Sequence, residues 1–114
     1  MKIKISDVIA VTEGRPTPGA DGIVESIVID SRDAVSGSLF VAFVGEHVDG
    51  HDFVADSYNR GALAALVERD VLAPQGLVTI RVDNTETALQ RLSAWQRSKF
   101  SDLQVLAITG SSGK

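Results

Sequence analysis

The sequence contains no cysteine in its 114 residues, which excludes a disulfide framework, a thiolate metal site and thiol catalysis. It has no apolar run of membrane-spanning length, and its start, Met1-Lys2-Ile3-Lys4-Ile5, lacks the long apolar stretch of a signal peptide. The net charge is -4 and charges of both signs are interspersed, so no basic face is available to grip a nucleic acid backbone. We expect a soluble, cytoplasmic domain with neither nucleic acid nor membrane as a partner.

The composition is that of a globular chain, with 44% hydrophobic and 23% charged residues. A chain of this length forms one ordinary domain with its own core. Short apolar runs alternate with amphipathic segments along the sequence. This order predicts an α/β fold with a small mixed or mostly parallel sheet flanked by helices.

The expected strands are short apolar or β-branched runs at residues 2–5, 23–29, 39–44, 64–67, 77–82 and 105–108. The expected helices cover residues 7–11, 52–60 and about 83–99, and residues 15–19 read as a loop. Ser6 is the expected cap of the first helix, and Gly14 its end. Asp83 and Glu86 resemble a capping box for the last helix, in which Trp95 lies on the apolar stripe.

One candidate functional cluster, Asp30-Ser31-Arg32, follows the second expected strand. Ligands of α/β sheets tend to sit beyond the carboxyl ends of the strands. A carboxylate, a hydroxyl and a guanidinium together suffice to hold a base or a phosphate. The alternative is a solvated strand end at which Asp30 and Arg32 form a structural ion pair.

A second cluster, Gly45–His51, lies between an expected strand and an expected helix. Its glycines allow close approach of a ligand, and the helix start offers free N–H groups to an anion. One alternative is a metal ion held by His47, Asp49 and His51, although no fourth ligand is evident. The other is a hydrogen-bonded turn in which His51 or Asp52 caps the helix. No Ser/His/acid arrangement suggests hydrolysis.

The end of the sequence pairs the expected strand Val105–Ile108 with a glycine-bracketed loop that finishes on a lysine. Glycines let backbone N–H groups cradle phosphate oxygens, and a lysine reaches the outer phosphates. The full pattern G-x-x-x-x-G-K-[ST] is not met, because Ile108 occupies its first glycine position. A flexible Gly/Ser tail is the alternative. The expected incomplete phosphate loop consists of Gly110, Ser111, Ser112, Gly113 and Lys114.

Several motifs in order, namely Asp30-Ser31-Arg32, Gly37–Ala42, Asp49-Gly50-His51-x-Phe53 and Gly61-Ala62, resemble the N-terminal domain of the Mur ligases. These are ATP-dependent amide ligases of peptidoglycan precursor synthesis, and the likeness runs from near residue 5 to the end. The resemblance implies that residues 1–103 form a domain that binds a UDP-muramoyl-peptide. It also implies that residues 104–114 are the first strand and the truncated phosphate loop of a missing ATP-binding domain.

The loop sequence Thr-Gly-Ser-Ser-Gly-Lys is similar to that of the family members that add D-alanyl-D-alanine to UDP-N-acetylmuramoyl-tripeptide. The alternatives are the preceding ligase, which adds the third amino acid to UDP-N-acetylmuramoyl-dipeptide, and a noncatalytic binding module. In the family's chemistry, ATP and Mg²⁺ in the central domain convert the peptide carboxylate into an acyl phosphate. The incoming amine, held by the C-terminal domain, then displaces phosphate.

The resemblance also assigns the nucleotide contacts by motif position. Three residues would contact the uracil or its phosphates, and three would line the other side of the nucleotide: Ile29, Ser31 and Arg32, then Glu46, His47 and Val48. The catalytic carboxylates, the magnesium ligands and the dipeptide site would belong to the two missing domains. We therefore expect no catalytic or metal-binding residue in this chain, and no catalysis by the chain alone.

Overall fold

A computed structural model describes the backbone of residues 2–108 and the side chains of residues 2–98. Its centre is a five-stranded sheet in the order β2-β7-β6-β5-β4. Strands β4 to β7 are parallel, and β2 runs antiparallel to β7 at one edge. The strands are β2 (Arg15–Pro16), β4 (Ser26–Val28), β5 (Ser38–Val41), β6 (Ala64–Val67) and β7 (Val78–Arg81). The predicted α/β fold with a small, mostly parallel sheet is thus confirmed.

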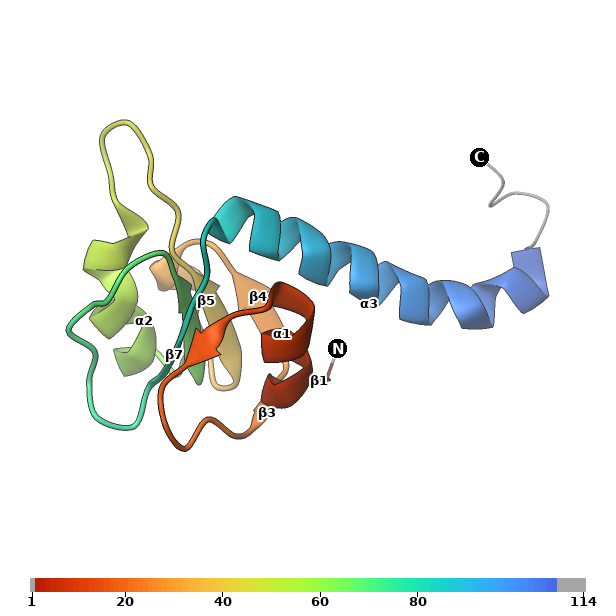
Figure 1. Cartoon of the computed structure of the whole chain (residues 1–114), viewed down its shortest axis with the longest axis horizontal. Helices are drawn as coiled ribbons and strands as arrows, with labels where there is room; N and C mark the ends of the chain where they lie inside the picture. Colours follow the sequence, from red (N-terminus) through yellow and green to blue (C-terminus); the bar gives the residue numbers. More distant parts are fainter. Residues whose placement is uncertain (1, 109–114) are drawn as a thin grey trace.

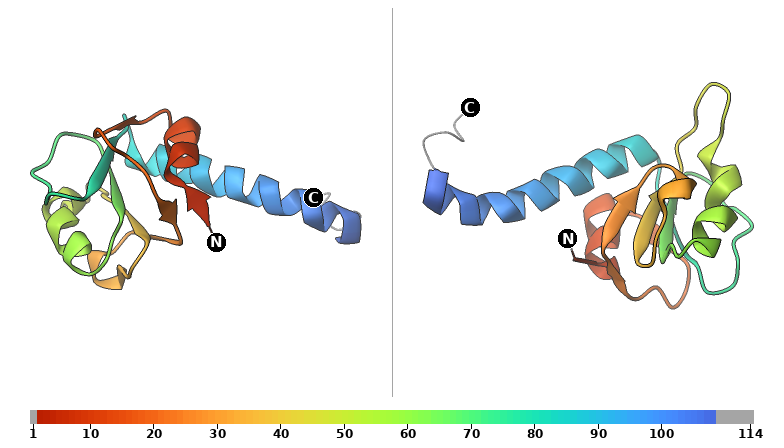
Figure 2. Two further views of the ribbon diagram at one scale, coloured as in Figure 1. Left: turned by 90° about the horizontal axis from the view of Figure 1, so that it is seen from below. Right: turned by 180° about the vertical axis from the view of Figure 1, so that it is seen from behind.

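Helices cover both faces of this sheet (Figures 1 and 2). Helices α1 (Ile5–Thr12) and α3 (Thr85–Ile108) pack on the face to which Leu39 and Val41 of β5 contribute. Helix α2 (Val54–Asn59) packs on the opposite face, which receives Phe40. Alternate residues of a strand point to opposite faces, so a continuous apolar run such as β5 fills two cores at once.

Two short 3₁₀ turns shape the α2 side of the sheet. Turn η1 (Ser31–Asp33) follows β4, and turn η2 (Gly50–Phe53) leads directly into α2. The predicted helix at residues 52–60 is therefore shorter than expected, and its first part is 3₁₀. No helix in the described part of the chain is both long and apolar enough to cross a membrane.

The predicted strand at residues 23–29 is divided between two sheets. Strand β3 (Ile23–Val24) pairs with β1 (Ile3–Lys4) in a separate two-stranded sheet, whereas β4 pairs with β5. Glu25 lies between them and donates its N–H to the Gly37 carbonyl at 2.8 Å. A run of β-branched residues predicts extended backbone, but it does not reveal a change of partner within the run.

The first helix also differs from its predicted boundaries. Helix α1 begins at Ile5, directly after β1, so Ser6 is inside the helix and does not cap it. The helix ends at Thr12, and its C-terminal cap is Glu13, which takes the left-handed conformation with φ 57°, rather than Gly14. Gly14 has a different role, because a Cβ there would collide with the side chain of Ile80.

The predicted loop at residues 15–19 contains strand β2, in which Arg15 pairs with Arg81 and Pro16 with Ile80. Proline is compatible with this position because β2 is an edge strand. The last helix is capped by Asn84, whose Oδ1 accepts the Thr87 N–H at 2.8 Å, and not by Asp83 as predicted.

Helix α3 continues to Ile108, so the predicted strand at residues 105–108 is wrong in this structure. No proline or glycine interrupts residues 85–108, and a helix satisfies its own backbone hydrogen bonds, whereas a strand needs a neighbour. The predicted phosphate loop, Gly110–Lys114, lies outside the described residues. The division of the chain at residues 103 and 104 stays a prediction.

Candidate functional site

An open cavity of about 800 Å³ lies at the carboxyl ends of β4 and β5, beside α2. Its walls come from the segment after β4, from the loop after β5 and from the η2–α2 segment. This is the place at which an α/β sheet is expected to hold a ligand. The lining residues are Ile29, Asp30, Ser31, Arg32, Phe40, Phe43, Gly45, Val48, Gly50, Phe53 and Asp56.

The polar residues of the cavity include the ion pair of Asp30 with Arg32, and Asp56, whose partner Arg60 lies outside the lining. Arg32 donates through Nε and Nη2 to the carboxylate of Asp30, with distances of 2.7 to 3.2 Å. Asp56 accepts two hydrogen bonds at one oxygen, Oδ2, from Ser31 Oγ at 2.8 Å and from Arg60 Nε at 3.1 Å. The ion pair between Asp30 and Arg32 that the sequence left open is therefore present, and it borders the cavity.

These contacts keep both carboxyl groups ionised. The hydrogen bonds from the Arg32 side chain and backbone lower the pKa of Asp30 to about 2. The hydrogen bond from Ser31, followed by that from Arg60, lowers the pKa of Asp56. The polar residues of the cavity thus present fixed charges of both signs to a ligand at neutral pH.

The lining also contains large apolar side chains. Ile29 and Val48 remain 57% and 59% exposed, and Phe53 remains 42% exposed. Large apolar side chains clustered on a cavity while still exposed indicate a surface that a ligand covers. A mainly apolar lining with a few placed polar groups is the usual composition of a small-molecule site.

The loop after β5 is a hairpin that protrudes from the body of the molecule (yellow in Figure 1). Val44 pairs with Asp49, and the Gly50 N–H donates to the Phe43 carbonyl at 2.7 Å. Glycine is required at position 50 because a Cβ there would lie 2.7 Å from the Phe43 backbone nitrogen. The hairpin brings Gly45 and Val48 to the cavity.

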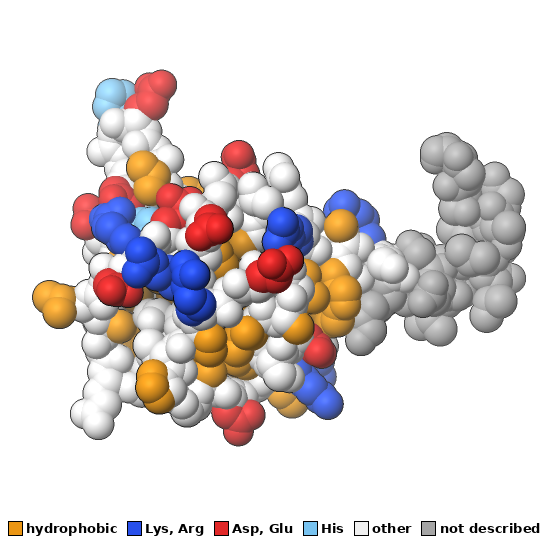
Figure 3. Space-filling model, in the orientation of Figure 1, with side chains coloured by type: hydrophobic (Ala, Val, Ile, Leu, Met, Phe, Trp, Pro, Cys, Tyr) orange, Lys and Arg blue, Asp and Glu red, His pale blue; other side chains and the backbone are white. Residues whose placement is uncertain are grey.

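The six predicted nucleotide-contacting residues divide into two groups. Ile29, Ser31, Arg32 and Val48 line the cavity. Glu46 and His47 do not line it: their side chains are 93% and 91% exposed on the protruding hairpin, where red and pale-blue side chains mark the tip in Figure 3. A ligand role for all six stays a prediction.

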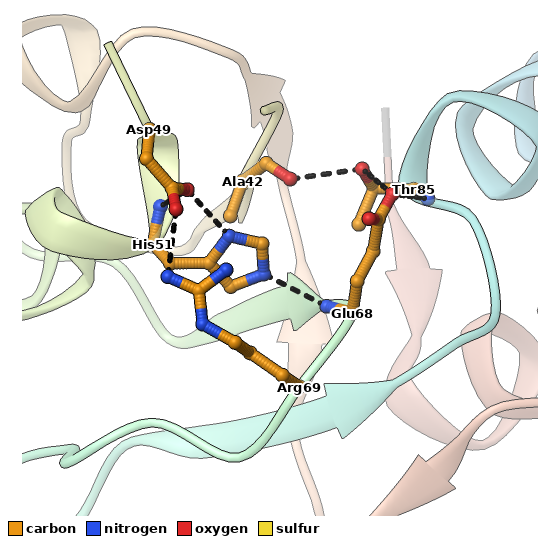
Figure 4. A network of polar contacts seen from close by, with 6 residues as sticks. All are labelled: Ala42, Asp49, His51, Glu68, Arg69 and Thr85. Atoms are coloured by element: carbon orange, nitrogen blue, oxygen red, sulfur yellow. Dashed lines mark hydrogen bonds and ion pairs between the residues drawn. The ribbon is translucent and has the colours of Figure 1, made fainter. Parts of the chain in front are cut away.

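A buried histidine fixes the base of this hairpin (Figure 4). Asp49 Oδ1 lies 2.7 Å from His51 Nδ1 and also accepts the His51 backbone N–H at 2.9 Å. The second ring nitrogen, Nε2, accepts the Glu68 N–H at 2.9 Å, and Arg69 donates to Asp49 Oδ2 at 2.6 Å. The hairpin is therefore attached to the end of β6.

The same network extends to the start of α3. The Glu68 carboxylate accepts the Thr85 N–H at 2.8 Å, and Thr85 Oγ1 lies 2.8 Å from the Ala42 carbonyl and 3.0 Å from Glu68 Oε2. Since the hydroxyl has one proton, it serves one of these two oxygens at a time. The carboxyl end of β5, the end of β6 and the first turn of α3 are thus joined by side chains.

This network distinguishes between the two alternatives for the cluster Gly45–His51, a metal site and a hydrogen-bonded turn. Both ring nitrogens of His51 have protein partners, so neither offers a lone pair to a metal ion. His47 is at the exposed tip, and within the described residues no three His, Asp or Glu side chains are grouped to hold a metal. The cluster is a hydrogen-bonded turn, capped by Asp49 rather than by His51 or Asp52.

Sequence reasoning missed part of the lining. Phe40, Phe43 and Phe53 were read as core or helix positions, yet all three border the cavity. Asp56 was missed as well, although its spacing of four residues from Arg60 is the signal of a helical ion pair.

Comparison with protein families gives a match to the model described as "Mur ligase family, catalytic domain" over residues 23–97. Among curated proteins, the UDP-N-acetylmuramoyl-tripeptide--D-alanyl-D-alanine ligase of Escherichia coli is 41% identical over 98 residues, which is 84% of this chain and 21% of the relative. The UDP-N-acetylmuramoyl-L-alanyl-D-glutamate--2,6-diaminopimelate ligase of Geobacter sulfurreducens is 39% identical over 92 residues, 80% of this chain and 18% of the relative. The chain spans about a fifth of the length of such relatives.

Comparison with solved structures gives a similar result. MurF from Acinetobacter baumannii superimposes with a TM-score of 0.77 and 31% identity, covering 87% of this chain and 22% of that protein. MurF ligase from Thermotoga maritima in complex with ADP superimposes with a TM-score of 0.53 and 30% identity, covering 59% of this chain and 15% of that protein.

Proposed function

This chain belongs to the Mur ligase family, and from that premise we propose that its cavity binds the uridine diphosphate end of a UDP-N-acetylmuramoyl-peptide. One observation carries the proposal. Ile29, Ser31 and Arg32 after β4 and Val48 on the hairpin line the same cavity, although they come from separate parts of the sequence. The volume of about 800 Å³ falls within the range of roughly 300–1,000 Å³ usual for small-molecule sites.

The chemistry of the walls supports this ligand. The apolar side chains of Ile29, Val48 and Phe53 suit the faces of a planar base or a sugar ring. Arg32 is a cation at the cavity, and its guanidinium side chain is 78% exposed and able to meet a phosphate. Ser31 contributes a hydroxyl to the same lining.

We further propose that the chain is the substrate-binding N-terminal domain of a cytoplasmic, ATP-dependent amide ligase. ATP, with Mg²⁺, would supply the phosphate that activates the peptide carboxylate, and both would be held elsewhere in the complete ligase. The predicted phosphate loop, Gly110–Lys114, lies outside the described residues, and the described part of the chain contains no candidate magnesium site. The role of this chain's own residues is to bind and orient the nucleotide end of the substrate.

For the complete ligase, we propose the addition of D-alanyl-D-alanine to UDP-N-acetylmuramoyl-tripeptide. This branch is supported by the name of the Escherichia coli relative and by that of a similar Acinetobacter baumannii structure, a UDP-N-acetylmuramoylalanyl-D-glutamyl-2,6-diaminopimelate--D-alanyl-D-alanyl ligase. The loop sequence at residues 109–114 also supports it. The second candidate is the diaminopimelate-adding ligase, favoured by the relative from Geobacter sulfurreducens. Phosphate release by the complete ligase, measured with UDP-N-acetylmuramoyl-tripeptide plus D-alanyl-D-alanine and with the dipeptide plus diaminopimelate, distinguishes the two.

Calorimetric titration of the chain with UDP, and separately with ADP, tests the binding function. We expect saturable binding of UDP and much weaker binding of ADP. Ser31→Ala should weaken UDP binding about tenfold, because a hydrogen-bonding group is lost from the cavity. Ser36→Ala is the matched control, since Ser36 is exposed and does not line the cavity. Equal binding of UDP and ADP, or no saturable binding of UDP, would overturn the proposal.

A further inference from the structure

The hydrogen bond between Ser31 and Asp56 has a fixed direction. Ser31 Oγ lies 2.8 Å from Asp56 Oδ2, and Ser31 is only 5% exposed. An ionised carboxylate accepts hydrogen bonds and cannot donate one. The single proton of the Ser31 hydroxyl is therefore directed toward Asp56.

Asp56 is itself held in place on α2. Arg60, one helical turn later, donates Nε to the same oxygen, Oδ2, at 3.1 Å. These two hydrogen bonds lower the pKa of Asp56, so the group stays a carboxylate at neutral pH. The Ser31 hydroxyl thus faces a constant acceptor, and its orientation does not depend on the ligand.

The direction of this hydrogen bond determines which ligand groups can bind next to Ser31. Because the Ser31 hydroxyl donates its proton to Asp56, it can only accept a hydrogen bond from a ligand in the cavity. A ring N–H placed against it forms a hydrogen bond, whereas a ring nitrogen with a lone pair is repelled. At ring position 3, uracil carries an imide N–H, whereas cytosine carries an unprotonated nitrogen.

We propose that Asp56 is a specificity-determining residue that makes the Ser31 hydroxyl an obligatory acceptor and thereby selects a uracil nucleotide over a cytosine nucleotide. Asp56 acts through Ser31, so it is a positioning residue. The inference rests on the proposed function and deepens it. It also gives a role to the pairing of Asp56 with Arg60, which otherwise is an ordinary ion pair within a short helix.

The test measures the dissociation constants of UDP and CDP for the unaltered chain and for substituted chains. The unaltered chain should prefer UDP, and Asp56→Ala should reduce the UDP-to-CDP preference about tenfold, because the freed hydroxyl can turn and donate to cytosine. Asp56→Asn should keep most of the preference, since its amide oxygen can accept the same proton. Asp52→Ala is the matched control, because Asp52 is exposed and does not line the cavity.

Two further measurements distinguish a change in base specificity from a general effect of the substitution on folding. In a chain that already carries Ser31→Ala, adding Asp56→Ala should leave the UDP-to-CDP preference unchanged. The unaltered chain should also bind 3-methyluridine diphosphate about tenfold more weakly than UDP, because the methyl group replaces the N–H. This measurement needs no substituted chain.

The outcomes distinguish the inference from the function on which it rests. If the unaltered chain does not bind UDP, the proposed function and the inference both fail. If it binds UDP but Asp56→Ala keeps the full preference over CDP, or 3-methyluridine diphosphate binds as well as UDP, the inference alone is overturned.

Discussion

His51 Nδ1 lies 2.7 Å from Asp49 Oδ1, and the opposite ring nitrogen of the same imidazole accepts the Glu68 N–H at 2.9 Å. An acceptor role for Nε2 requires the neutral ring with its proton on Nδ1, where it points at Asp49. The side chain of His51 is 1% exposed. This residue therefore holds the cavity hairpin to the end of β6 as a buried, uncharged bridge.

The first prediction concerns this bridge. His51→Ala should destabilise the fold by about 2–3 kcal/mol, because it leaves the half-buried Glu68 N–H without its acceptor and removes the hydrogen bond between the His51 ring and Asp49. His47→Ala is the matched control, since the His47 side chain is 91% exposed, and it should change stability by less than about 0.5 kcal/mol. Urea unfolding followed by circular dichroism measures both. Equal effects of the two substitutions would contradict the role given to His51.

The second prediction concerns acid stability. The His51 backbone N–H, followed by the Arg69 and His51 side chains, holds the pKa of Asp49 well below its ordinary value of 3.8. A carboxyl group whose pKa is lowered in the folded state stabilises that state above pH 3.8, and this contribution disappears as the pH falls through the lower, folded pKa. Asp49→Asn should therefore be less stable than the unaltered chain at pH 7, and the difference should shrink below about pH 4.

Urea unfolding at pH 7, 5, 3 and 2 measures that difference. Asp52→Asn removes a carboxyl group from the same turn, but from an exposed side chain, and serves as the control. A difference between the unaltered chain and Asp49→Asn that stays constant over this range would show that the charge of Asp49 does not stabilise the fold.

The fold was predictable from the sequence where the residues of one segment are enough to determine its secondary structure. Strand β6 was predicted with its observed bounds, because the apolar run Ala64–Val67 is buried on both faces. The division of residues 23–29 between two sheets was not predictable, since it depends on which distant strand lies alongside each half. Strand β2 was missed for the same reason: Arg15–Pro16 becomes extended by pairing with β7.

The candidate site, too, was predictable only where local sequence determines it. Ser31 and Arg32 could be found from the sequence because they are polar residues directly after a strand, and both line the cavity. Their partners could not: Asp56 reaches Ser31 from α2, and Phe53 borders the cavity although its position suits a helix core. Such neighbours are set by how α2 packs on the sheet, which local sequence does not specify.

The third prediction concerns the charge at the cavity. Arg32→Ala should weaken UDP binding about tenfold and reduce its dependence on salt, because a guanidinium that meets a phosphate is lost. Arg91→Ala is the control: Arg91 pairs with Glu13 and does not line this cavity. Titrations in 50 mM and 500 mM sodium chloride measure both effects. An unchanged salt dependence in Arg32→Ala would show that Arg32 does not contact the diphosphate.

The fourth prediction concerns ATP. Phosphate release from ATP by the purified chain should not exceed that of buffer, because the residues that activate the peptide carboxylate are proposed to lie elsewhere in the ligase. Lys114→Ala is the matched control for contaminating ATPases. Hydrolysis by the chain that disappears in Lys114→Ala would contradict the proposed division of labour and would show that Gly110–Lys114 acts alone.

The most direct test of the central claim is an NMR titration of the chain with UDP that follows backbone amide shifts, with ATP as the comparison ligand. The proposed site predicts that UDP shifts cluster at residues 29–32, at 43–50 and around Phe53 and Asp56, with little change at these residues when ATP is added. UDP shifts concentrated elsewhere, or shifts that ATP reproduces at the same residues, would contradict the assignment of this cavity to the uridine nucleotide.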